Sequence, residues 1–164
     1  MKESIEIKER NYQFDNYFEK DVISEDTRRK VTNTDILAIP GLYKDGEYYF
    51  AQETIEFIKF CRKQNTENSF DVLADGDIKV RSLHSFDIWL PIIYIASSIF
   101  MPVTLNLVSS YIWEKIKGRE HEEPHVNVTI LVKDGDKQKE FHYDGDAESF
   151  IEGFEKIDIN KIFE

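Results

Sequence analysis

The sequence predicts an α+β fold: a small mixed or antiparallel sheet packed against an apolar helix, in the order strand, helix, strand, long apolar helix, hairpin and helix. Three observations predict it. Segments with strand-like alternation stand beside segments with helical periodicity, and 26 consecutive uncharged residues lie between Asp87 and Glu114. An Asp-Gly dipeptide at 134–135 separates two alternating segments. With 41% hydrophobic and 13% aromatic residues in 164, the chain can bury a core.

The first 34 residues are predicted to form an arm that precedes a compact domain over residues 35–164. Ile5 and Ile7 alternate as in a short strand. An amphipathic helix should follow, because four apolar residues recur at helical spacing: Phe14, Tyr17, Phe18 and Val22. An apolar stripe of this kind must cover the chain's own domain or another protein. Both placements stay open, and these four residues are the candidates for contact with a partner.

Strand and helix alternate at the start of the compact domain. The run ILAIPG, residues 36–41, predicts a strand closed by proline and glycine. The segment QETIEFIKFCRKQ, residues 52–64, predicts an amphipathic helix. The segment FDVLADGDIKVRSL, residues 70–83, predicts a strand or a hairpin that turns at Asp75-Gly76, because Asp-Gly favours tight turns.

The uncharged segment 88–113 must be buried. We predict a long helix that starts near Pro91, with a kink or a break into two helices at Pro102, because proline removes a backbone donor. Gly118 should end this helix.

Two placements of the segment 88–113 stay open. We favour the protein core, because polar groups at the prolines, Asn106 and the serines need partners that lipid does not provide. The alternative is a single membrane span that tethers a sensor or effector, with the C-terminal hairpin in the cytoplasm.

The C-terminal part predicts a hairpin and a capped helix. Apolar residues alternate over 126–132 and again over 141–143, on the two sides of Asp134-Gly135. Val128 and Ile130 should face the apolar helix. Asp146 is a suitable N-cap for a final helix, AESFIEGFEKI, residues 147–157. Its apolar stripe consists of Phe150, Ile151, Phe154 and Ile157.

Charge and cysteine content restrict the partners and the compartment. The net charge of −11 argues against nucleic-acid binding, which needs a basic surface, and makes membrane adhesion less favourable. Cys61 is the only cysteine, and the N-terminus lacks the apolar stretch of a secretory signal. We therefore expect a cytoplasmic protein, with Cys61 buried and unreactive among its apolar neighbours.

We find no recognisable catalytic constellation, and so expect no enzymatic activity, no cofactor and no metal site. His121 and His125 are spaced like metal ligands, but Pro124 prevents them from sharing a helical face. His84 and His142 fall in predicted strands without ligand partners at a recognisable offset.

The alternative is a small enzyme that combines dispersed acids and histidines. Its first candidates are Asp71, Asp75 and Asp77 beside Arg81, although acids in turns are usually exposed and have no chemical role.

Three stretches resemble the effector-associated constant component family of bacterial conflict systems: VLADGDIKV at 72–80, SYIWEKIKG at 110–118 and VNVTILVKDGDKQKEFHYDGDAESFIEGF at 126–154. The resemblance covers residues 36–157; the chain departs from the family pattern in its N-terminal arm and in two prolines within the apolar run. It implies a small non-catalytic α+β module that accompanies a variable effector in bacterial antiviral defence, as an adaptor. The implied partner is another protein, either the effector or a second copy of the chain. No site residues carry over.

Overall fold

The computed structural model describes residues 4–9, 25, 29, 33–42, 45–73, 79–81, 88–134 and 137–154. Its main sheet has six strands in the order β1-β9-β8-β7-β2-β5. In chain order these are β1 (Ser4–Glu9), β2 (Ile36–Ile39), β5 (Phe70–Val72), β7 (Ile88–Ile95), β8 (His125–Asp134) and β9 (Lys137–Asp146). A second sheet contains β3 (Gly41–Leu42), β4 (Tyr48–Ala51) and β6 (Val80–Arg81). The helices are α3 (Thr54–Gln64), α4 (Met101–Ile116) and α5 (Ala147–Gly153), with 3-10 turns η1 (Ser98–Phe100) and η2 (Glu120–Glu122).

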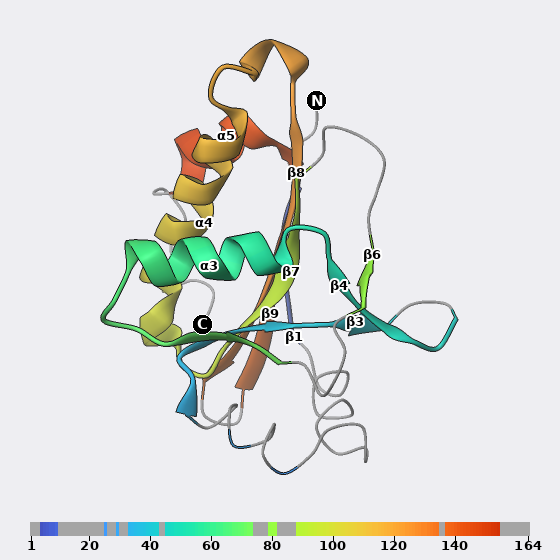
Figure 1. Ribbon diagram of the computed structural model, residues 1–164, viewed down its shortest axis with the longest axis vertical. Helices are drawn as coiled ribbons and strands as arrows, with labels where there is room; N and C mark the ends of the chain where they lie inside the picture. The colour runs from blue at the N-terminus through green and yellow to red at the C-terminus, as the bar shows by residue number, and fades with distance from the viewer. Residues whose placement is uncertain are drawn as a thin grey trace.

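The three helices cover one face of the main sheet, and the small sheet lies on the other side (Figure 1). The larger core cluster lies between the helices and the sheet and includes Phe57, Ile93, Ile112, Ile130 and Phe141. A smaller cluster on the opposite face consists of Leu37, Ile39, Leu73 and Tyr94. Strands β2 and β7 contribute to both clusters and are therefore buried on both faces. This arrangement confirms the predicted α+β class with a mixed sheet.

Two strand–helix–strand units place α3 and α4 beside each other. Strands β2 and β5 are parallel and are connected through α3, and β7 and β8 are parallel and are connected through α4. Parallel neighbours need such a crossover connection, because a tight turn reverses the chain direction and can therefore join only antiparallel strands. The two units meet where β2 and β7 pair antiparallel. Both helices lie on the same face of the sheet, and so they pack against each other.

The prediction of one long helix over 88–113 is wrong for its first third. Residues 88–95 form the central strand β7, and only residues from Met101 onward form the helix α4. Pro91 is tolerated in a central strand because it lies at a bulge: the register between β7 and β8 shifts between Trp89 and Ile92. Most of the segment is buried core, as the favoured placement required.

Pro102 starts a helix and does not kink one. It occupies the first turn of α4, where the missing N–H would have no intrahelical partner. Ser97 caps the preceding turn η1, and its side chain accepts a hydrogen bond from the Ile99 amide at 3.4 Å. Gly118 has a φ of +83° just after α4, which confirms the predicted stop. None of the helices in the described ranges is long and apolar enough to cross a membrane.

The predicted C-terminal hairpin and the capped helix after it are confirmed, with the helix α5 ending at Gly153; Ile157, which was predicted to belong to its apolar stripe, lies outside the described residues. Strands β8 and β9 pair antiparallel in one register from His125↔Asp146 to Asp134↔Lys137. Val128 and Ile130 are buried in the cluster that includes α4. Asp146 caps α5 by accepting a hydrogen bond from the Ser149 amide at 3.0 Å.

Two further predictions concern residues 70–83 and the strand around Ile5 and Ile7. Strand β5 lies in the main sheet and β6 in the small sheet, so these two strands do not pair as the two arms of a hairpin, which was one alternative for residues 70–83. The strand predicted around Ile5 and Ile7 is β1, and it pairs antiparallel with β9 at the edge of the main sheet.

Candidate functional site

A groove crosses the outer side of the helical layer, and we call it the helix groove. It has a volume of about 410 Å³. Helix α4 contributes most of its lining, α3 contributes two residues, and one aromatic residue follows α5. The lining residues are Phe60, Gln64, Asn106, Ser109, Ser110, Trp113, Glu114 and Phe154. The groove therefore combines three aromatic rings with amides, hydroxyls and one carboxylate.

Trp113 is the unusual member of the helix groove. Its side chain is 47% exposed, although tryptophan is usually largely buried. The opposite side of α4 packs into the core through residues such as Val108 and Ile112. The helix therefore buries one stripe and presents Trp113 on the other side. A large aromatic ring with one polar N–H suits a protein-binding surface.

A polar network holds α3 against α4 beside the groove. The Tyr111 hydroxyl donates to the Glu53 carboxylate at 2.8 Å and lies 3.3 Å from a Glu56 oxygen. Lys115 forms an ion pair with Glu53 at 3.6 Å and a shorter one with Glu56. Burial and the hydrogen bond to Glu53 raise the pKa of Tyr111 above its usual value of 10, so the hydroxyl stays protonated and able to donate.

Aromatic packing connects this network to the groove. Phe57 and Phe60 both meet the Tyr111 ring edge to face, each with ring centroids 5.3 Å apart. Phe60 also lines the helix groove. The network thus fixes the position of one groove wall relative to α4.

The network predicts that the difference in stability between the wild type and a Glu56→Gln variant depends on pH. The pKa of Glu56 lies below its usual value of 4.5, mainly because Lys115 donates a hydrogen bond to it. The stabilisation of the fold by the Glu56–Lys115 interaction is therefore present above pH 4.5 and is lost as the pH falls through the lowered pKa of Glu56. Because the Glu56 side chain is 63% exposed, we expect Glu56→Gln to cost less than about 1 kcal/mol at neutral pH and nothing in strong acid.

Urea unfolding of the wild type and the Glu56→Gln variant across this pH range would measure that difference. Glu67→Gln, at an exposed acid without an ion pair in the described ranges, is the matched control. A Glu56→Gln difference that does not change with pH would contradict the prediction.

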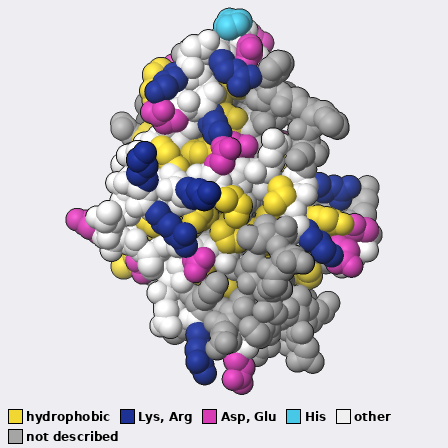
Figure 2. Space-filling view, viewed as in Figure 1, with side chains coloured by type: hydrophobic (Ala, Val, Ile, Leu, Met, Phe, Trp, Pro, Cys, Tyr) yellow, Lys and Arg dark blue, Asp and Glu magenta, His cyan; other side chains and the backbone are white. Residues whose placement is uncertain are grey.

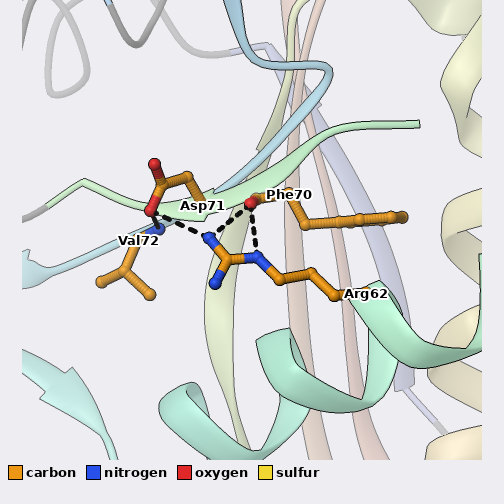
Figure 3. Close-up of polar contacts among 4 residues, drawn as sticks. All are labelled: Arg62, Phe70, Asp71 and Val72. Carbon is orange, nitrogen blue, oxygen red and sulfur yellow. Dashed lines mark hydrogen bonds and ion pairs between the residues drawn. The ribbon is translucent and has the colours of Figure 1, made fainter. Parts of the chain in front are cut away.

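Arg62 anchors the C-terminal end of α3 to β5 (Figure 3). Its Nε and Nη2 donate to the Phe70 carbonyl at 3.0 and 2.8 Å, and Nη2 also reaches Asp71 at 3.3 Å. The same Asp71 oxygen accepts from the Val72 amide at 2.7 Å. Asp71, which the sequence suggested as part of a dispersed acid site, therefore has a structural role in connecting α3 to the sheet.

Those of the other proposed catalytic or metal-binding residues that the structure describes have separate partners. Arg81 lies over the Tyr49 ring at 5.4 Å, and Asp75 and Asp77 are outside the described residues. Thr129 and His142 share a hydrogen bond of 2.9 Å, and His125 pairs with Asp144 across the hairpin.

Among the residues that the structure describes, no three His, Cys, Asp or Glu side chains could hold a metal ion together. His121 is exposed in η2, and His84 is outside the described residues. Cys61 is buried, and burial raises the pKa of its thiol to about 12, in agreement with the expectation of an unreactive cysteine.

Sequence reasoning missed the helix groove. The four residues expected to contact a partner, Phe14, Tyr17, Phe18 and Val22, lie outside the described residues. One signal for the groove was present: Asn106, Ser110 and Trp113 follow each other at intervals of four and three along an otherwise apolar helix. This spacing places polar atoms and one tryptophan on the same side of α4.

Comparisons of the chain with protein-family models, curated proteins and solved structures found no match.

Proposed function

We propose that the chain is a non-catalytic protein-binding module that docks a partner in the helix groove. The observation that carries this proposal is Trp113, which is half-exposed and lines the groove together with Phe60, Phe154 and polar residues that offer both donors and acceptors. Interfaces concentrate their binding energy in a few aromatic and arginine residues surrounded by polar groups. The helix groove likewise combines aromatic rings with polar side chains.

The walls of the groove are also held in place before a partner arrives. Tyr111 connects Phe60 to the acids of α3 and to Lys115 of α4, so the two helices do not need to reorganise on binding. A preorganised surface loses less conformational entropy on binding and therefore binds more tightly.

The proposed partner is an effector protein of a bacterial defence system, for which the chain acts as an adaptor. This part of the proposal depends on the resemblance of residues 72–80, 110–118 and 126–154 to the effector-associated constant component family. The segment 110–118 contains Trp113, so the resemblance and the groove overlap in the chain.

Affinity purification from cells of the source organism tests the proposal. We expect one protein to co-purify in stoichiometric amount with the wild type and to decrease at least tenfold with Trp113→Ala. The matched control is Ile99→Ala, which removes an exposed apolar side chain outside the groove lining and should retain the partner. The unfolding midpoints of both variants should stay close to that of the wild type. Equal recovery of the partner by Trp113→Ala and wild type would refute the groove as the docking site.

A further inference from the structure

Two lysines on the outer side of α3 differ from the other bases of the helical layer. Helix α3 and residues 101–119 together carry six bases and two acids in a chain whose net charge is −11. Arg62 pairs with Asp71, Lys117 with Glu114 and Arg119 with Glu122. Lys115 pairs with Glu56 of α3 and with Glu53, the N-cap residue of that helix. Lys59 and Lys63 are exposed and form no ion pair within the described ranges. Figure 2 shows Lys and Arg side chains gathered over α3.

The spacing of these two lysines does not favour the fold. They lie four residues apart on α3, so their side chains are neighbours on the helix surface and repel each other. Glu56, one turn before Lys59, attracts its ammonium group, but the Glu56 carboxylate already accepts hydrogen bonds from Lys115 and Tyr111. An acid supplied from outside the chain would relieve this repulsion.

Neither of the two lysines lines the helix groove, but each directly precedes a residue of α3 that does. Phe60 lies between them in the sequence and lines the groove, and Gln64, the next residue after Lys63, lines it as well. On the α4 side, Lys117 follows Trp113 by one helical turn. A segment lying in the groove would therefore contact aromatic rings of α3 and α4, and the ammonium groups of Lys59 and Lys63 follow from the neighbouring positions of α3.

We propose that the segment that docks in the helix groove is an acidic amphipathic stretch of the partner protein. Its apolar residues would pack against Phe60 and Trp113, and its carboxylates would reach Lys59 and Lys63. This inference rests on the proposed function and names the chemistry of the partner. A long polyanion such as nucleic acid fits less well, because a net charge of −11 repels it beyond the groove, whereas a short acidic segment meets mainly the local lysines.

Selection of a random peptide library on the purified full-length chain tests the inference. Affinities of the selected peptides are then measured by fluorescence anisotropy for four proteins: the wild type, Trp113→Ala, Lys59→Glu with Lys63→Glu, and Lys79→Glu with Lys133→Glu. The last pair is the matched control, because it changes the net charge by the same amount at exposed lysines outside α3 and α4: Lys79 precedes β6 and Lys133 lies in β8. We expect acidic peptides that bind at least tenfold more weakly to Trp113→Ala and to the Lys59/Lys63 variant, and less than twofold more weakly to the control. Their affinity should also fall as the salt concentration rises.

The outcomes separate the two proposals. Peptides that need Trp113 but are neutral or basic, or that bind the Lys59/Lys63 variant as tightly as the wild type, would overturn the acidic partner and leave the groove standing. Peptides that do not need Trp113, or a selection that yields no binder, would overturn both. Tighter binding of a single-stranded oligonucleotide than of any selected peptide, when lost in the Lys59/Lys63 variant, would overturn the protein partner.

Discussion

Replacing Phe150 with alanine is expected to destabilise the fold by about 3–5 kcal/mol, the usual cost of removing a buried phenylalanine ring. Phe150 is 2% exposed and packs edge to face on Tyr143, with ring centroids 5.1 Å apart. It is the main contact through which the short helix α5 docks on the β8–β9 hairpin. The loss leaves a cavity between α5 and the sheet that the surrounding rigid strands cannot close. Urea unfolding at neutral pH measures the change in the free energy of unfolding.

Phe154 is the matched control for this substitution. It stacks on Phe150 with a centroid distance of 6.4 Å but is only partly buried, at the edge of the helix groove. We expect Phe154→Ala to cost about 1 kcal/mol in stability and to weaken partner binding. Equal destabilisation by the two substitutions would contradict the described packing of α5.

Ile112→Ala is expected to cost about 2–5 kcal/mol. The Ile112 side chain is 0% exposed and lies in the buried stripe of α4, in the same cluster as residues of β7 and β8. Because this cluster joins both strand–helix–strand units, a cavity there loses contacts with several elements at once. Chemical unfolding monitored by circular dichroism gives the difference from wild type.

Ile99 provides the comparison within the same uncharged segment. It is 74% exposed in η1, so Ile99→Ala should change the free energy of unfolding by no more than about 0.5 kcal/mol. An equal cost of Ile99→Ala and Ile112→Ala would contradict the described packing, in which Ile99 is exposed and Ile112 is buried in the core.

The sequence predicted well where its signals were local. The β8–β9 hairpin alternates on both sides of Asp134-Gly135, and Asp146 can cap only the helix that follows it. The amphipathic pattern of α3, with its buried Phe57, Ile58 and Cys61, likewise needs no information from distant residues. In each case the residues that form the sequence pattern are also the residues whose interactions stabilise the element.

Local signals were insufficient for residues 88–95. A strand buried on both faces has apolar residues at every position, so its periodicity does not distinguish it from a buried helix. The abundance of isoleucine favoured a strand, but Pro91 suggested a helix start. Pro91 is compatible with a strand only because the pairing with β8 shifts at that point, and this shift is a property of two strands together.

The sequence by itself determined the fold class, the helix α3, the C-terminal hairpin with its capped helix, and the burial of most of the uncharged segment. Only the tertiary structure decided the division of that segment into β7 and α4, and the position of the helix groove. The physical reason is the same for both. Whether an apolar residue is covered depends on which elements pack against it, and Trp113 remains exposed because α3 and α5 flank α4 without covering its outer side.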